Sequence, residues 1–302
     1  MPVSSQPFVI KKLALFGIGL IGGSFALALR RAGAAQHIVG VGRSQNNLDD
    51  ALRLGIIDQA TTDSVQAVQG ADFVMLATPV GQMEGLLGAI APHLSSNPVI
   101  TDGGSTKQDV VAYARTKLGK NFPRFVPGHP IAGTEKSGAT AADGELYCGR
   151  KVILTPESDT DRAAIEAVRG SWRACLAEVH LMRPAEHDAV FAAISHLPHL
   201  LAFSLVDWMA RKPNHRALFQ FAAGGFRDFT RIASSSPEMW RDICLANRSA
   251  LLAELADYRA ELALLQDCLE RSDAEQLETL FSRARATRDD WLAETKSAAG
   301  IE

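Results

Sequence analysis

The sequence is poor in the features that mark several classes of protein. It has only four cysteines in 302 residues, and none of them forms a Cys-x-x-Cys pair, which argues against a disulfide scaffold and a structural zinc site. Acidic and basic residues nearly balance at a formal net charge of −3, so no nucleic-acid or membrane-surface footprint is indicated. The opening residues 1–7 lack the charged start and apolar core of a secretory signal. These absences favour a soluble, cytoplasmic protein.

The sequence also lacks an uninterrupted hydrophobic run of membrane-spanning length. Residues 13–29 come nearest, but they are short for a span and are interrupted by small residues. A strand, a turn and a helix explain this stretch better. We therefore expect no membrane partner.

Short β-branched runs alternate with helical stretches from residue 11 to about residue 182, the pattern of a parallel sheet covered on both faces. The predicted strands are Lys12–Phe16, His37–Val41, Phe73–Ala77, Val99–Thr101, Arg124–Val126 and Lys151–Leu154. Beyond Pro184 no strand pattern appears, and apolar residues recur at helical spacing. The sequence thus predicts an α/β domain at residues 1–182 and an all-α domain at residues 183–302.

One long helix of the second domain carries a coiled-coil-like seam. Its apolar residues step by four and three, at Leu251, Leu255, Tyr258, Leu262, Leu265 and Leu269. Such a seam packs either inside the chain or against a second copy, and the pattern alone leaves both open. Ser272 and Glu275 form a Ser-x-x-Glu capping box, which predicts that a last helix starts there and runs to about Glu294.

A glycine motif directly follows the first predicted strand and precedes a helical segment. It reads Gly17-Ile18-Gly19-Leu20-Ile21-Gly22. In a dinucleotide-binding turn, Gly17 permits the tight bend, Gly19 lets the backbone approach a pyrophosphate and Gly22 allows close packing of helix on strand. A purely structural turn is the alternative, but the strand–turn–helix context favours a Rossmann-type domain in which all six residues contact the cofactor.

The second predicted strand ends without the acidic residue that holds the ribose of NAD in such folds. Arg43 and Ser44 stand there instead. An arginine and a hydroxyl can hold the 2′-phosphate of NADP, so NADP is favoured and NAD is the alternative. If Arg43 is only a solvated residue that stacks on the adenine, the choice of cofactor stays open.

Two further predicted strands end at the same edge of the sheet as the glycine motif, where a ligand crevice is expected. Thr78 and Pro79 follow the third strand, and Ser105 and Lys107 follow the fourth. Because ligands of such sheets bind at the carboxyl ends of the strands, these residues are candidate contacts for cofactor or substrate. The alternative is that Asp102 or Ser105 only caps the helix beginning near Lys107.

Residues 128–138 read Gly-His-Pro-Ile-Ala-Gly-Thr-Glu-Lys-Ser-Gly, a polar segment between two predicted buried strands. The segment is either an elaborate loop or part of an active site. His129 lies about where the chemistry of a nucleotide-binding fold would need a proton acceptor. We therefore take His129 as the leading catalytic candidate.

Four blocks occur in order along both domains: residues 128–138, 195–199, 224–231 and 237–242. Together they resemble the prephenate and arogenate dehydrogenases of tyrosine biosynthesis, over about residues 11 to 260. The resemblance implies a Rossmann-type domain followed by an all-α dimerisation domain, and a homodimer. It also implies NAD(P)-dependent oxidative decarboxylation of prephenate or arogenate, which gives 4-hydroxyphenylpyruvate or tyrosine without a metal.

That reaction requires an acceptor for the ring-hydroxyl proton, and clamps for the substrate's carboxylates. The resemblance assigns the proton acceptor to His129, and a contact with the same hydroxyl and the nicotinamide to Ser105. It also assigns six residues to substrate binding: His196, Arg231, Arg227, Gly224, Trp240 and Glu135. Among these, His196 and Arg231 meet carboxylates, and Arg227 is a second clamp on the same face if that stretch is helical. The alternative for either arginine is an ordinary surface residue. Glu135, Asp228 and Arg231 resemble a gating ion network, and Trp240 a residue that closes the pocket.

Several alternatives accompany this interpretation. His196 and His199 are spaced like a pair of metal ligands, but Pro198 should kink the helix between them by removing the bond to the Ile194 carbonyl, and no third ligand is evident. A β-hydroxyacid dehydrogenase or an imine reductase would share the glycine loop, yet would not need both His129 and His196. A non-catalytic NADPH-binding regulator would tolerate the loss of His129, Ser105 and Arg231, and all three are present in this sequence. The sequence does not distinguish prephenate from arogenate.

Overall fold

The computed structural model describes residues 8–94, 97–134 and 136–298 and divides the chain into two compact units, residues 1–248 and 249–302. Residues 1–7 and the predicted gate residue Glu135 lie outside the described residues. The helices that follow residue 183 are shared between the two units.

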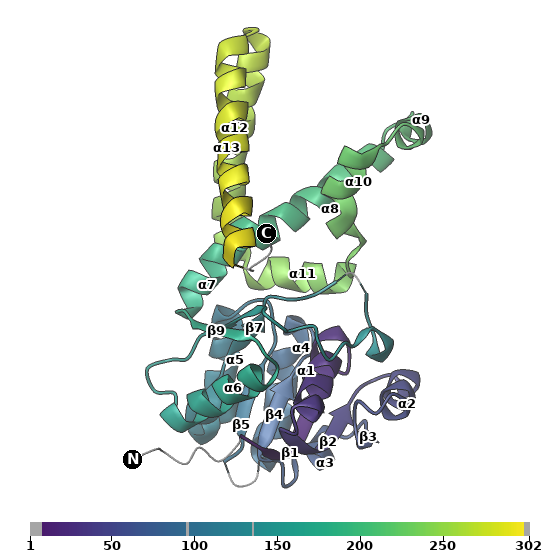
Figure 1. The fold of residues 1–302 in the computed structure, drawn as a ribbon, viewed down its shortest axis with the longest axis vertical. Helices are drawn as coiled ribbons and strands as arrows, with labels where there is room; N and C mark the ends of the chain where they lie inside the picture. The colour runs from purple at the N-terminus through teal and green to yellow at the C-terminus, as the bar shows by residue number, and fades with distance from the viewer. Residues whose placement is uncertain (1–7, 95–96, 135, 299–302) are drawn as a thin grey trace. The chain divides into compact units, whose positions relative to one another are not determined.

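A six-stranded parallel sheet forms the centre of the first unit (Figure 1). Its order is β3-β2-β1-β4-β5-β6, with β1 Ile10–Phe16, β2 Ala35–Val41, β3 Gln59–Thr61, β4 Phe73–Leu76, β5 Val99–Asp102 and β6 Phe125–Val126. Five predicted strands appear here within two residues of their expected ends. The short edge strand β3 was missed because it has no buried residue and no apolar run.

A separate three-stranded sheet corrects the prediction of one continuous parallel sheet. It holds β7 Gly128–Pro130, β8 Lys151–Leu154 and β9 Glu178–Leu181 in that order. The segment 151–154 therefore belongs to another sheet, where it runs antiparallel to β7. Pro127 interrupts the chain after β6, so the polar segment that carries His129 begins as a strand. The strand β9 escaped prediction because its side chains are mostly exposed.

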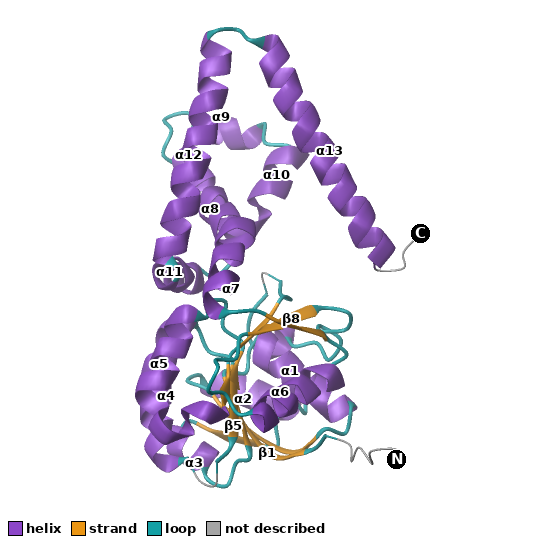
Figure 2. Ribbon diagram, turned by 90° about the vertical axis from the view of Figure 1, so that its left-hand side faces the viewer, coloured by secondary structure: helices purple, strands orange, loops and turns teal. Residues whose placement is uncertain are grey.

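Helices cover both faces of the main sheet. They are α1 Leu20–Arg31, α2 Gln45–Arg53, α3 Ser64–Val68, α4 Val80–Ile90, α5 Gln108–Leu118 and α6 Arg162–Ala174. Leu13 and Leu15 of β1 pack in the core beneath α1 and α6, whereas Ala14 and Phe16 pack in the core beneath α3, α4 and α5. Figure 2 shows α4 and α5 on one side of the strands and α1 and α6 on the other. Residues 13–29 are thus a strand, a turn and a helix, as predicted.

The helices after β9 begin with a long apolar run. They are α7 Pro184–Phe191, a π turn Ala192–His196, α8 Leu197–Ala210, α9 His215–Gln220, α10 Gly224–Thr230 and α11 Pro237–Ala246. By length and composition, the run Pro184–Ala210 is the one helical stretch among the described residues that could cross a membrane. It also carries three buried polar side chains, His187, Asp188 and His196. These belong to the network described below.

The kink predicted at Pro198 takes the form of the π turn just before it. Leu197 N donates to the carbonyl of Ala192, an i→i+5 bond, and Pro198 follows as the second residue of α8. Proline has no N–H to donate, so it is best tolerated in the first turn of a helix. Pro198 takes such a position, where the wide turn ends and regular α-helix resumes. The helix continues through this point rather than breaking.

The second unit is a hairpin of α12 Arg248–Glu270 and α13 Ala274–Ala298. The predicted Ser272 and Glu275 capping box is wrong: Ser272 has φ +54°, and the Asp273 carboxylate accepts from Gln276 N at 3.0 Å. Asp273 therefore caps α13. In the α12 seam, the larger exposed side chains are Tyr258, Leu262 and Leu269.

Candidate functional site

The glycine loop between β1 and α1 matches the geometry of a dinucleotide cradle. Gly17 has φ +88°, and a Cβ there would lie 2.5 Å from the carbonyl oxygen of Ala77. A Cβ on Gly22 would lie 2.1 Å from the carbonyl oxygen of Gly17, so helix and loop pack too closely for a side chain. A Cβ on Gly19 would meet nothing within 4 Å. No side chain caps the start of α1, which leaves room and N–H groups for a phosphate.

The end of β4 forms the neighbouring side of this cradle. A Cβ on Gly17 would lie 3.1 Å from Thr78 N. The hydroxyl of Thr78 is buried, and it has no hydrogen-bond partner within the described part of the chain. Pro79 follows and precedes the first turn of α4. A buried hydroxyl without a partner beside the loop is what a bound cofactor amide or hydroxyl would satisfy.

The adenosine end of the cradle has Arg43 and Ser44 exposed after β2. Ser44 Oγ accepts from Asn47 N at 3.4 Å and so caps α2, while its own hydroxyl proton remains available. Asn47 was not predicted. Its amide donates to the carbonyl of Ile18 at 2.7 Å and accepts from Ala139 N at 2.7 Å, so it ties the glycine loop to the segment after His129.

Lys107 is not the ligand contact that the sequence suggested, because its side chain is fully buried in an ion pair with Asp102. The ammonium also donates to the carbonyl of Gly128 at 2.7 Å. Asp102 accepts from Gly128 N at 3.0 Å and from Gly104 N at 2.8 Å. The pair therefore fixes the first residue of β7, next to His129. Asp102 does not cap α5.

His129 begins a chain of hydrogen bonds that sets its protonation. Its Nδ1 lies 2.8 Å from Nε2 of His187, whose Nδ1 lies 2.8 Å from a carboxylate oxygen of Asp188. Because an ionised carboxylate only accepts, His187 Nδ1 carries the proton and its Nε2 accepts from His129 Nδ1–H. The network therefore leaves a lone pair on His129 Nε2, the form that a proton acceptor needs.

The electrostatics keep His129 neutral. Burial lowers its pKa well below the ordinary 6.5, and repulsion from His187, Lys107 and His196, whenever these groups are protonated, lowers it further. Burial also lowers the pKa of His187, against the opposing effect of Asp188. Both imidazoles are thus neutral near pH 7.

Asp188 anchors this chain from α7. Its carboxylate accepts from Lys107 N at 2.8 Å and from Gln108 N at 2.9 Å, and so caps the start of α5. Burial raises the pKa of Asp188, but the hydrogen bonds from His187 and these two amides outweigh it and lower the pKa. Neither His187 nor Asp188 was predicted. The only sequence signal was the adjacent His-Asp pair in an apolar helix.

His196 occupies the other side of the network. Its Nδ1 lies 3.0 Å from Nδ2 of Asn247, and burial lowers its pKa to about 4. Its Nε2 is buried, and no hydrogen-bond partner for it is found among the residues that the structure describes. Trp240 is buried with its ring edge-on to His196 at 6.1 Å and stacked on His199 at 3.6 Å.

Both arginines predicted as clamps are exposed, Arg227 on α10 and Arg231 in the turn that follows it. The shared helical face expected for Arg227 and Arg231 requires one helix that contains both residues. The helix α10 ends at Thr230, however, and Arg231 begins the 3-10 turn Arg231–Ser234. The charge on Arg231 contributes to a lowered pKa of His199, which places it near that ring. Arg227 lies 3.7 Å from the carboxylate of Asp228, and Gly224 opens α10. The network thus joins His129, His196 and Trp240, whereas no described contact joins Arg227 or Gly224 to it.

Ser105 is half-buried in the turn between β5 and α5. A Cβ on Gly103 in the same turn would lie 3.1 Å from Ile21 and 3.7 Å from Pro130. The glycine loop, this turn and β7 are therefore neighbours.

Within the described residues no group of three His, Cys, Asp or Glu side chains could hold a metal ion.

Two family models match consecutive parts of the chain. The prephenate dehydrogenase nucleotide-binding domain matches residues 25–181, and the prephenate dehydrogenase dimerization domain matches residues 183–283. Together they account for the order found in the structure, a parallel-sheet nucleotide-binding domain followed by a helical dimerisation domain.

Individual relatives agree with these matches. Prephenate dehydrogenase of Bacillus subtilis is 42% identical over 92% of this chain and 75% of its own length. Cyclohexadienyl dehydrogenase of Zymomonas mobilis is 35% identical over 93% of this chain and 96% of its own. The crystal structure of Aquifex aeolicus prephenate dehydrogenase with hydroxyphenyl propionate and NAD+ superposes with a TM-score of 0.88 at 38% identity, covering 94% of this chain and 99% of that one. The chain belongs to the prephenate dehydrogenase family.

Proposed function

We propose that this protein catalyses the NAD(P)-dependent oxidative decarboxylation of prephenate or arogenate in tyrosine biosynthesis. The observation that carries the proposal is the lone pair on His129 Nε2, held beside a glycine loop shaped for a dinucleotide. The curated relatives bear the names prephenate dehydrogenase and cyclohexadienyl dehydrogenase. We expect the enzyme in the cytoplasm.

His129 takes the proton of the ring hydroxyl on Nε2 while hydride leaves the carbon that bears this hydroxyl. The bound dinucleotide supplies the hydride acceptor. Carbon dioxide leaves the opposite ring carbon, the electrons of the broken C–C bond complete the aromatic ring, and the resulting phenolate takes a proton back to become the phenol of the product. The proton gained by His129 can be shared along Nδ1 toward His187 and Asp188, whose carboxylate stabilises the positive charge that forms.

The remaining site residues hold the substrate in this proposal. Ser105 contacts the reacting hydroxyl, and His196 and Arg231 bind carboxylate oxygens. Trp240 closes the pocket against the histidine rings that it packs on. Arg227, Gly224 and Glu135 keep the roles proposed from the sequence: Arg227 as a second clamp, Gly224 as a substrate-binding residue and Glu135 as a gate.

NADP is the cofactor that we propose the enzyme prefers, because Arg43 is exposed and no carboxylate replaces it at the end of β2. The Aquifex relative binds NAD+, so both cofactors must be compared. Arg43→Ala should raise the KM for NADP about 10-fold and leave the KM for NAD within about 2-fold, since a charge-assisted bond to the 2′-phosphate is lost. The control is Arg53→Ala. Arg53 lies at the end of α2, the helix that follows Arg43 and Ser44, and its guanidinium is paired with Asp50. If the KM for NADP and the KM for NAD change equally, Arg43 does not bind the 2′-phosphate.

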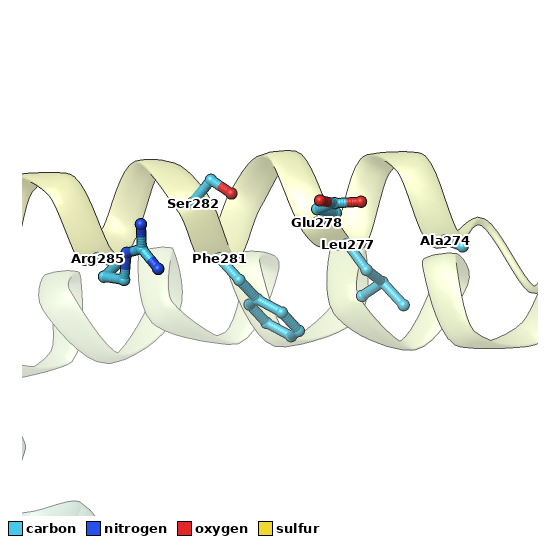
Figure 3. A pocket seen from close by; sticks show the side chains of 6 residues that line it. All are labelled: Ala274, Leu277, Glu278, Phe281, Ser282 and Arg285. Atoms are coloured by element: carbon cyan, nitrogen blue, oxygen red, sulfur yellow. The ribbon is translucent and has the colours of Figure 1, made fainter.

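A homodimer through the C-terminal helices completes the proposal. The α12 seam leaves Leu262 and Leu269 exposed, at 47% and 66%, so the described hairpin does not bury the seam within one chain. On α13, Leu277 and Phe281 project from one side of an open groove of about 420 Å³ (Figure 3). Exposed apolar surface on this scale is typical of an interface between copies.

The deciding experiment measures initial rates with prephenate and arogenate, each with NADP and with NAD. We expect reduction of NADP with at least one of the two substrates. If neither substrate reduces either cofactor while NADPH still binds, the non-catalytic regulator is the better description. A clear preference for NAD would overturn only the proposal for Arg43.

A further inference from the structure

The amide of Asn247 is oriented by a backbone group. Asn247 is buried at the end of α11, and its Nδ2 donates to the carbonyl oxygen of Asp188 at 2.7 Å. A carbonyl oxygen accepts hydrogen bonds and cannot donate one, so this contact fixes which end of the amide is the NH₂ group.

The same NH₂ group lies 3.0 Å from Nδ1 of His196. Because the amide nitrogen only donates, Nδ1 of His196 must accept, and the ring proton is on Nε2. That Nε2 is the buried atom that has no partner in the described chain. A buried N–H without a partner is costly, so its presence points to an acceptor that arrives with the ligand.

We propose that Asn247 is a positioning residue that holds His196 in the Nε2–H tautomer, so that this imidazole donates a hydrogen bond to a carboxylate oxygen of the substrate. The identity of the acceptor rests on the proposed function, whereas the tautomer does not. The two histidines of the site are then held in opposite forms: His129 presents a lone pair, and His196 presents a proton.

The groups that face His196 agree with a neutral donor. Asp188 and His187 approach from α7, His199 follows on α8, and Trp240 covers the ring from α11. Only Asp188 favours the protonated ring, and burial outweighs it. A neutral N–H can bind an anion without the desolvation cost of a second buried charge.

The tautomer can be observed directly in the protein bound to NAD+. Histidine labelled with ¹⁵N gives different shifts for protonated and unprotonated ring nitrogens, and loss of one set in His196→Gln assigns the signals. We expect His196 to show a protonated Nε2 and an unprotonated Nδ1 at pH 7.5. A protonated Nδ1 would overturn the proposal whatever the enzyme catalyses.

Asn247→Asp tests the consequence for binding. A carboxylate accepts from Nδ1–H, so the variant should reverse the tautomer and turn a lone pair toward the ligand oxygen. The Kd of hydroxyphenyl propionate, measured by calorimetry with NAD+ present, should rise about 10-fold to 100-fold at pH 8. It should fall again toward pH 6, because the added carboxylate favours the imidazolium, which donates from both nitrogens.

Asn121→Asp makes the same chemical change at a buried residue in the 3-10 turn Gly119–Arg124, outside the network. The Kd of hydroxyphenyl propionate for this variant should match that for the parent protein at both pH 6 and pH 8. A Kd in Asn247→Asp that rises equally at pH 6 and pH 8 would indicate a packing role only and would contradict the proposal. Should the variant fail to fold, the tautomer measured in the parent protein still decides.

Discussion

His129→Asn should lower kcat about 100-fold to 10,000-fold and leave cofactor affinity within about 2-fold, because asparagine keeps a polar side chain but accepts no proton. His129 lies on β7, whereas the dinucleotide cradle is built from the turns after β1 and β4. Single-turnover reduction of the cofactor, followed by its absorbance, separates the chemical step from binding. An unchanged rate of this step would exclude His129 as the base.

His180→Asn is the matched control for that variant. The register of the small sheet pairs His129 with Ile153 and Ile153 with His180, so both histidines lie in one row of the same sheet. His180 is exposed and 3.9 Å from Glu178. Its replacement should leave kcat within about 2-fold.

The pH dependence of the parent enzyme follows from the same environment. Since the pKa of His129 is lowered from 6.5, the base stays unprotonated as the pH falls through 6.5, and kcat/KM should decline only at lower pH. A profile whose acid limb has its midpoint at or above 6.5 would contradict this assignment.

Lys107→Met should lower the free energy of unfolding by about 3–5 kcal/mol, because it leaves the fully buried carboxylate of Asp102 without its cation. The variant also removes the bond from the ammonium to the carbonyl of Gly128. Since that residue precedes His129, kcat should fall together with stability. Denaturant unfolding of the protein bound to its cofactor measures the first effect.

The control for Lys107→Met is Lys117→Met near the end of α5, the helix that Lys107 directly precedes. Lys117 lies 3.1 Å from Glu84 with both side chains partly exposed, and such surface pairs contribute at most about 1 kcal/mol. If both variants lose less than about 1 kcal/mol, the buried pair does not hold the turn before β7.

Local sequence rules were sufficient to predict the strand, glycine loop and helix at residues 10–31. Gly17 and Gly22 have steric reasons that depend on near neighbours in the chain or on the adjacent strand, whereas a Cβ on Gly19 would meet nothing within 4 Å. The main strands were readable for a similar reason: strands buried on both faces are continuous apolar runs. The exposed strand β9 has no such run and left no signal.

The residues that set the protonation of the site could not be predicted in this way. Asp188 caps a helix that begins about 80 residues earlier in the chain, and Asn247 contacts His196 across 51 positions. An aspartate or an asparagine in a helix has many ordinary explanations, and only the folded chain shows which hydrogen bonds it makes. Lys107 was misjudged because a lysine is rarely buried unless it is paired, and its partner is itself at a strand end.

The π turn before Pro198 has a consequence for where insertions and deletions can be tolerated. His187 and His196 are nine positions apart on one continuous helical run; at about 100° per residue, a regular α-helix would turn them to opposite sides. In the π turn, closed by the i→i+5 bond to Ala192, the backbone rotates by a smaller angle per residue than in a regular α-helix. Both rings therefore reach one network. The wide turn acts as a spacer of one residue. Loss of one residue together with the π turn would leave the two histidines eight positions apart on regular helix, at about 80° from each other, so both could still reach the network. Straightening the turn without losing a residue would keep the helix and its hydrophobicity, but would turn His187, which supports the proton acceptor, to the side opposite His196.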